Sequence, residues 1–442
     1  MHGTDDVRGL LRPGDEGYDA LCPAWNLAVT HRPAYVVAAE SSEHIARAVA
    51  WAARNGVRVR VQATGHGALR PAGDELLILT DRLTGVSVDP ETATALIQPG
   101  TRWKQVAEAA APYGLAPLCG TSSSVGAVGF SLGGGLSWLS RKHGLASDAI
   151  VKAQLVTAGG ELRWIDDRTA PDLMWALRGG GPNFGVVTAL RVRLVPAAEV
   201  YGGALYWPVE QIRNVLTGYR EWLEGVPVEV TSLAGVLHVP DNPAMPEHLR
   251  GRSFARVCLV HCGPGAPDLD RLRAIPGLVD DTTGPMPFTR IDEITQDPRD
   301  PLPISINAEV LTELSDGVID HLASIAPRGA EPYLMLMVRH VGGGDHADSR
   351  ASGSAYWSGE FVVATISIGA GQEIRDFGKR LAAGLGPAAN GRVPFNFVGE
   401  PGEMCRVFTA EHERRLAELK RRHDPAAMFG GDRPITTPFA TP

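Results

Sequence analysis

The sequence lacks any long uninterrupted run of apolar residues. Hydrophobic residues make up 44% of the 442 positions, an ordinary share for a globular protein. No apolar run reaches the roughly 18 residues that a bilayer-spanning helix needs. The first residues, Met1–Asp6, are polar and partly acidic, unlike a secretory signal peptide. We therefore expect neither a membrane span nor secretion.

Cysteine is scarce, with five scattered residues. An odd, scattered set is typical of a reducing compartment, so we expect a cytoplasmic protein without a disulfide framework. Cys258, His261 and Cys262 are close enough in sequence to suggest a metal site. In a strand the two thiols would lie about 13 Å apart and His261 would point to the opposite face. That geometry does not suit tetrahedral zinc, so no metal site is expected.

Positive charge is in deficit. Lysine and arginine number 42 against 50 acidic residues, which gives a net charge of −8. This balance argues against nucleic acid or an anionic membrane as the main partner.

What the sequence does contain is a histidine between two glycines, directly after a strand-like segment. Residues Val57–Val61 alternate valine with arginine, and this period of two predicts a strand with one apolar face. In Gly65-His66-Gly67 the glycines allow a sharp turn and a close approach to a bound group. Successive amide N–H groups in such a turn can bind phosphate oxygens. A Rossmann fingerprint is absent here, because the third glycine is missing and Pro71 prevents a following helix.

A second glycine-rich stretch, Leu115–Asp148, is too apolar for a solvated loop. Its many glycines also make it a poor helix and a poor strand. We interpret it as a buried segment whose backbone lies against a large ligand.

The remaining pattern predicts a mixed fold. A helix opens at Ser41–His44 with a capping hydroxyl and closes at Asn55-Gly56, and a hairpin joins Ile150–Val156 to Glu161–Ile165. After Ala197 an amphipathic helix is followed by candidate strands separated by long connections, notably Asp280–Pro303. The strands expected there are Ser232–Val239, Arg256–His261, Tyr333–Val341 and Glu360–Ile368. These features indicate a second, α+β domain built on an antiparallel sheet.

Three blocks of this chain resemble one enzyme family. They are VQATGHGA at Val61–Ala68, GAVGFSLGGGLSWLSRKHG at Gly126–Gly144 and DLMWALRGGGPNFGVV at Asp172–Val187. Their order and spacing are similar to those of the covalent-flavin, FAD-linked oxidases of the vanillyl-alcohol-oxidase fold, in the bacterial part of the berberine-bridge-enzyme-like branch. The C-terminal Phe395–Phe397 and Leu416–Phe429 resemble the family's closing segment. The likeness is weakest between about residues 200 and 390.

The resemblance implies an α+β fold with a two-part FAD-binding domain of the PCMH type. That domain would comprise residues 1–199, the substrate-binding domain residues 200–390, and residues 391–442 would return to the FAD-binding domain. The residues implied to bind FAD are Ala63, Thr64, Gly65, His66, Gly67, Ser122, Val125, Gly126, Gly129, Gly133, Val186 and Asn396.

His66 matches the family's histidine that bonds covalently to the flavin 8α-methyl. A neutral imidazole is a good nucleophile near pH 7. Many relatives add a second link through a cysteine, whose position is occupied here by Ser122. A hydroxyl is a much weaker nucleophile than a thiolate, so a single link through His66 is expected. Cys119, three residues earlier, could form a second link only if this loop has a different register.

The active-site base is left open by two departures from the family. Ala68 and Pro394 stand where relatives often carry tyrosines. His340 has a counterpart in the bacterial sub-branch and would face the cavity if its strand covers the flavin, although a purely structural role in the sheet is as compatible with the sequence. Tyr206 is a second candidate for the same cavity.

The resemblance implies an FAD-dependent oxidase. An alcohol or amine of a small natural-product-like substrate, in secondary metabolism, would give a hydride to flavin N5, and dioxygen would reoxidise the flavin. Two alternatives are a flavin-dependent cyclase or isomerase of a secondary metabolite, and a non-catalytic flavin-containing protein that binds a ligand. The substrate and the oligomeric state are not encoded in any motif.

Overall fold

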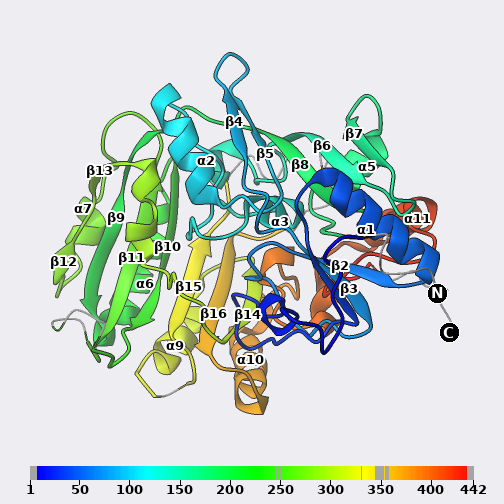
Figure 1. Ribbon diagram of the computed structural model, residues 1–442. Coiled ribbons are helices and arrows are strands. Elements are labelled where there is room, and N and C mark those ends of the chain that lie inside the picture. Colours follow the sequence, from blue (N-terminus) through cyan, green and yellow to red (C-terminus); the bar gives the residue numbers. More distant parts are fainter. Residues whose placement is uncertain are drawn as a thin grey trace.

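The computed structural model describes residues 7–243, 247, 250–329, 331–343, 353 and 358–435. Three sheets organise the chain (Figure 1). The first has three parallel strands in the order β1-β3-β2: β1 (Tyr35–Ala38), β2 (Arg58–Gln62) and β3 (Glu75–Leu79). The second has five antiparallel strands in the order β4-β5-β8-β6-β7: β4 (Val86–Asp89), β5 (Thr94–Ile97), β6 (Ile150–Val156), β7 (Leu162–Asp166) and β8 (Val186–Arg193).

Helix α1 (Ser42–Asn55) joins the first two sheets. The Ser41 hydroxyl accepts a hydrogen bond from the His44 amide at 3.1 Å, and Gly56 ends the helix with φ +67°. The buried face of α1, including Ile45 and Val49, packs in one cluster with residues of both sheets. The predicted start and end of this helix are therefore confirmed.

Strand β2 differs from its predicted amphipathic pattern. Val59 is buried as expected, but Arg60 is only 5% exposed. Its guanidinium pairs with Glu75 at 2.9 Å and with Asp432, which also accepts the amide of Leu69 at 2.9 Å. A buried charge is tolerated because it is paired, and the alternation of valine and arginine does not reveal that pairing.

The glycine-rich stretch is buried, as predicted, but it contains short helices that were not predicted. These are α3 (Ala127–Leu132) and α4 (Ser140–His143). Tertiary packing has overridden weak helix propensity at these positions.

The third sheet has eight strands in the order β12-β9-β11-β10-β15-β16-β14, with β13 paired to β9. All its pairs are antiparallel, which confirms the predicted kind of sheet. Its strands are β9 (Glu199–Pro208), β10 (Val230–His238), β11 (Ser253–His261), β12 (Asp280–Asp281), β13 (Gly284–Pro287), β14 (Ile304–Leu311), β15 (Met335–His340) and β16 (Phe361–Ile368). Strands β9, β12, β13 and β14 were not predicted, and β12 and β13 fall within Asp280–Pro303, which was expected to be a connection.

This large sheet buries both of its faces. Helices α6 (Ile212–Leu223), α9 (Asp316–Ile325) and α10 (Gln372–Leu385) cover one face (Figure 1). The other face packs against the five-stranded sheet and the glycine-rich stretch in the main core cluster. The remaining helices are α2 (Trp103–Ala110), α5 (Pro171–Leu177), α7 (Asp270–Arg273), α8 (Asp292–Thr295) and α11 (Ala410–His423). None of the described helices combines the length and apolarity that a bilayer span needs.

The C-terminal helix α11 returns to the N-terminal part through a buried ion pair. Lys420 Nζ lies 2.5 Å from the Asp424 carboxylate and donates to the carbonyls of Asn183 and Phe429 at 2.7 and 2.9 Å. Asp424 accepts the amides of Met428 and Phe429, each at 2.9 Å. These bonds fix the chain that continues to residue 433.

The Lys420–Asp424 pair gives a test of this anchoring. Replacement Asp424→Ala leaves a buried ammonium without its counter-charge and the amides of Met428 and Phe429 without an acceptor, and we expect a loss of about 3–5 kcal/mol of unfolding free energy. The matched control is Glu418→Gln, which breaks the exposed Arg422–Glu418 pair on the same helix and should cost less than about 1 kcal/mol. Denaturant unfolding compares the two. Equal effects would contradict the assigned role of the buried pair.

Candidate active site

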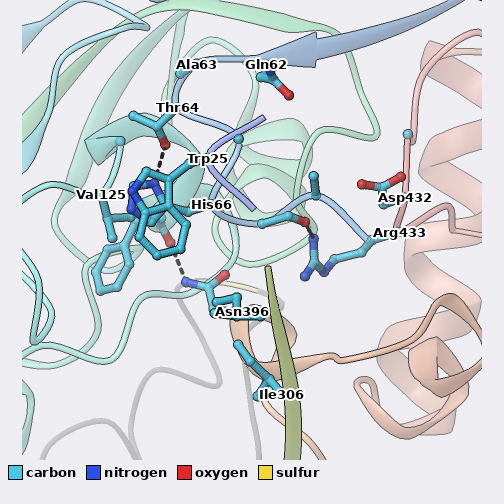
Figure 2. A pocket seen from close by; sticks show the side chains of 18 of the residues that line it. Trp25, Gln62, Ala63, Thr64, His66, Val125, Ile306, Asn396, Asp432 and Arg433 are labelled. Carbon is cyan, nitrogen blue, oxygen red and sulfur yellow. Dashed lines mark hydrogen bonds between the residues drawn. The ribbon is translucent and has the colours of Figure 1, made fainter. Parts of the chain in front are cut away.

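The cavity that collects most of the predicted cofactor residues has a volume of about 390 Å³. Ligand pockets in proteins commonly enclose 300–1,000 Å³. Its walls come from the loop after β2, the stretch from Gly120 to Phe130, the ends of three strands of the large sheet, and the C-terminal residues Phe395–Phe397 and 429–433 (Figure 2). Segments far apart in the sequence therefore meet around one space.

The loop after β2 turns at Gly65, which has φ +80°. A Cβ at this position would lie 2.8 Å from the Ala24 side chain and 2.8 Å from the Trp25 amide nitrogen. The amide of Trp25 donates to the Thr64 carbonyl at 3.1 Å. Glycine is needed here both for its left-handed conformation and for the close approach of residues 24–25.

His66 projects from this turn with its ring held on three sides. The imidazole stacks on the Trp25 indole, with ring centroids 4.1 Å apart and planes 13° apart. Its Nδ1 lies 2.8 Å from the Thr64 hydroxyl (Figure 2), and its Nε2 lies 3.4 Å from the Ser124 hydroxyl. Burial, with the nearby Arg102 charge, lowers the pKa of His66 to about 4. The ring is thus neutral near pH 7 and keeps a nitrogen lone pair.

Three serines follow in the next wall. The hydroxyls of Ser122 and Ser124 are 2.8 Å apart, and the latter reaches His66. Ser123 is held by its amide and its hydroxyl to the two carboxylate oxygens of Asp292, each at 2.6 Å. Asp292 belongs to α8, so an element beside the large sheet fixes the loop that carries these serines.

Cys119 lies behind this loop. It is fully buried in the main core cluster and is not among the residues that line the cavity. Its Sγ donates to the Gly120 carbonyl at 3.4 Å, and burial raises the pKa of the thiol well above its usual range.

The glycines of α3 play two different roles. A Cβ on Gly129 would meet no atom within 4 Å, so this position leaves room in the cavity. A Cβ on Gly133 would lie 1.7 Å from the Asn396 side-chain oxygen. Gly133 therefore does not line the cavity but lets Asn396 approach, and the Asn396 amide donates to the Phe130 carbonyl at 2.9 Å.

The C-terminal segment adds Arg433, which the sequence did not indicate. Its guanidinium donates to the carbonyls of Gly67 at 2.7 Å and Val398 at 3.2 Å (Figure 2). Its Nε is buried and makes no hydrogen bond with any residue that the structure describes. Trp25, Asp297 and Asp432 are further lining residues that were not predicted. No local pattern signals them, because each depends on contacts between distant parts of the chain.

Most of the residues implied by the resemblance meet at this cavity. Those that line it are Ala63, Thr64, Gly65, His66, Gly67, Ser122, Val125, Gly126, Gly129 and Asn396. Gly133 and Val186 do not. Val186 begins β8 and packs in the core cluster that also contains Val156 and Met428.

The two candidate bases lie elsewhere. Along β15, Met335 and Met337 face the cavity side of the sheet, whereas Leu336 and Val338 belong to the helix-covered side. By this alternation His340 faces the helices, where it packs on Phe361 with ring centroids 5.5 Å apart. His340 therefore does not reach the cavity, contrary to expectation. Tyr206 lies on the cavity side of β9 but not among the lining residues, and burial raises its pKa to about 12.

Comparison with known proteins agrees with this architecture. The model of the family described as an FAD binding domain matches residues 33–166. The chain is 27% identical to (R)-6-hydroxynicotine oxidase of Paenarthrobacter nicotinovorans over 95% of its length and 94% of that protein. It is 34% identical to xylooligosaccharide oxidase of Thermothelomyces thermophilus, over 48% of this chain and 47% of that one.

Solved structures share the whole fold. The crystal structure of 6-hydroxy-D-nicotine oxidase from Arthrobacter nicotinovorans superimposes with a TM-score of 0.84 at 24% identity, covering 99% of each chain. The Physcomitrella patens BBE-like 1 structure gives a TM-score of 0.81 at 18% identity, covering 97% of this chain and 96% of the other. These findings confirm the predicted fold and the predicted class of an FAD-dependent oxidase.

The two glycines at Gly65 and Gly129 provide a matched test of the cavity. Replacement Gly65→Ala places a methyl against backbone in a left-handed conformation, and should cost more than about 1 kcal/mol of stability. Gly129→Ala adds the same methyl to open space on a helix, and should change stability by no more than about 1 kcal/mol while lowering the FAD content. Thermal unfolding and the flavin absorbance of each purified variant measure the two effects. A normal FAD content in Gly129→Ala would contradict the position of the cavity.

Proposed function

We propose that this chain, an FAD-dependent oxidase by fold and sequence, carries its FAD on His66 alone and oxidises a small, largely apolar alcohol or amine. The observation that carries the proposal is the protonation state and the position of the His66 imidazole. A neutral imidazole, held by Trp25 and Thr64 at the wall of the cavity, is the nucleophile that attachment to the flavin 8α-methyl requires.

The cavity suits a dinucleotide. The amide N–H groups of Thr64, Gly65 and Gly67 make no hydrogen bond with another described residue, so they are available to phosphate oxygens. The buried Nε of Arg433 adds a positive charge on the same side. Gly129 leaves space where a side chain would intrude. Ala63, Val125 and Gly126 would complete the binding surface, and Asn396 would face the flavin.

A single covalent link is supported by the second wall. Ser122 stands at the cavity with a hydroxyl bonded to Ser124, and hydroxyls are poor nucleophiles near neutral pH. Cys119 is buried away from the cavity and its thiol is kept protonated. Bound FAD would supply the hydride acceptor, and dioxygen is the acceptor we propose for its reoxidation.

The substrate class is argued from the sheet side of the cavity. Lining side chains there are aliphatic: Ile304, Ile306, Leu334, Met335, Ile366 and Ile368. Ile368 is 47% exposed, so apolar surface continues to the outside. Burying the hydroxyls of an oligosaccharide against such a wall would cost free energy without compensating hydrogen bonds. A compact apolar amine or alcohol, such as the substrate named for the 6-hydroxynicotine oxidase, fits better than a sugar chain.

The linkage is tested by mass spectrometry of the denatured protein. We expect the wild type to carry the mass of one FAD and His66→Ala to carry none, because the only attaching nucleophile is removed. Cys119→Ala is the matched control and should keep the full mass. A flavin that remains covalently attached in His66→Ala would overturn the assignment, and loss in Cys119→Ala would point to the thiol.

The reaction is tested with a panel of apolar secondary amines and alcohols, with xylobiose as the polar comparison. Under nitrogen, at least one apolar compound should bleach the flavin absorbance, and admitted air should restore it with one hydrogen peroxide per product. The product should weigh two hydrogens less than the substrate. A product of unchanged mass would instead favour a cyclase or isomerase, and bleaching by xylobiose alone would overturn the proposed substrate class.

A further inference from the structure

Asp297 is a carboxylate in the cavity wall, beside Thr121 and Thr295. It follows α8, directly after Gln296, whose φ of +55° is uncommon for a residue with a side chain. Two residues further on, the Arg299 carbonyl accepts the Trp25 indole N–H at 3.2 Å. The segment is thus fixed to the residue on which His66 stacks.

Asp297 and Asp432 are the carboxylates among the described lining residues. Asp432 is committed to Arg60 and to the amide of Leu69. Asp297 forms no ion pair within 4.0 Å with any described residue. Its neighbour Thr121 lines the cavity beside Ser122, in the wall that also reaches His66. The Asp297 carboxylate therefore borders the part of the cavity assigned to the flavin ring.

The surroundings of Asp297 contain donors that are not yet satisfied. Arg256 is fully buried on the cavity side of β11, and one of its nitrogens donates to the Thr295 carbonyl at 2.8 Å. Its Nε and Nη2 are buried and make no hydrogen bond within the usual distance and angle with any residue that the structure describes. Buried donors of this kind are normally paired. Neither Arg256 nor Thr295 lines the cavity, and both favour the charged form of the Asp297 carboxylate.

We propose that Asp297 is the base that removes the substrate's hydroxyl or amine proton. This inference rests on the proposed function. Bound FAD would accept the hydrogen of the substrate's C–H bond as a hydride, which carries both electrons of that bond, while the proton of the O–H or N–H bond would pass to the Asp297 carboxylate. The electron pair left behind forms the C=O or C=N bond of the product. Asp297 would thus supply the active-site base that the sequence left unassigned. Ala68 and Pro394 stand where relatives often carry tyrosines, and His340 lies on the other face of the sheet.

The electrostatic environment agrees with this role. Burial raises the pKa of Asp297, while Thr121, Arg256 and Thr295 oppose the shift and Asp292 adds to it. Arg339 on β15 is a second cation that faces it, and the thiols of Cys119 and Cys258 are neutral neighbours with raised pKa values. A carboxylate whose pKa is moved toward the working pH is a more effective base than an ordinary one.

The first test compares Asp297→Asn with Asp300→Asn, an exposed carboxylate in the same segment. The substrate is the compound from the amine and alcohol panel that bleaches the wild-type flavin fastest. We expect anaerobic bleaching to slow by about 100-fold or more in Asp297→Asn, with loss of the decline in rate at low pH. Asp300→Asn should keep both. A change of less than threefold in Asp297→Asn would overturn the proposal while leaving the proposed oxidase function intact.

A second measurement does not need turnover. Because the folded-state pKa of Asp297 is raised, the folded protein holds this proton more tightly than the unfolded chain, so stability falls as pH rises from the unfolded to the folded pKa. In the His66→Ala background, freed of FAD, Asp297→Asn should therefore raise the melting temperature at pH 8, and this gain should shrink at pH 4. A lower melting temperature at pH 8 would mark a structural carboxylate and overturn the proposal. If no panel compound bleaches the wild type, the proposed function fails, and this measurement still decides whether Asp297 is held as a poised base.

Discussion

The buried charge of Arg60 constrains the whole site. Removed from water, this guanidinium requires paired acceptors, and the chain supplies Glu75 from the neighbouring strand and Asp432 from its C-terminal segment. The same carboxylate of Asp432 accepts the amide of Leu69, so the loop after β2 and the end of the chain are fixed to one another. Arg433 then reaches the Gly67 carbonyl. The turn that carries His66 is thus held from the side opposite Trp25.

The large sheet contributes through α8 and the chain that follows it. Asp292 holds Ser123 by two short hydrogen bonds, and the Arg299 carbonyl holds the Trp25 indole. Trp25 stacks on His66, and Ser123 adjoins Ser124, whose hydroxyl lies near His66 Nε2. Helix α8 and the segment after it therefore line the cavity through Asp297 and also order the two loops that lie next to His66. The position of the histidine is set jointly by both halves of the chain.

Local patterns were sufficient for features whose physics is local. The Ser41 cap, the Gly56 stop, the hairpin of β6 and β7 and the glycine turn at His66 each depend on a few consecutive residues. Strand β9 was missed because Gly202 and Gly203 interrupt its apolar pattern, although the close backbone of residues 282–283 leaves no room for a side chain at Gly203. The burial of Arg60 was missed because its partner Asp432 lies 372 residues away.

The misplacement of His340 has a different cause. Its strand was correctly predicted, but a sheet covered on both faces gives no alternation of polar and apolar residues from which to choose a face. Only the packing of α6, α9 and α10 decides it. Asp297 was not considered because it falls in what the sequence presented as a long connection, and its importance comes from Trp25 and Thr121, which are distant in sequence.

The walls around His66 combine residue 25 with residue 433, and this has a consequence for biosynthesis. While the polypeptide is still being translated, the first two sheets can already assemble, but Asn396, Asp432 and Arg433 have not yet emerged from the ribosome. In a nascent chain the cavity therefore lacks the wall that residues 395–397 and 429–433 form. The attachment of FAD to His66 that we propose would therefore wait until residues 396–433 are synthesised and docked.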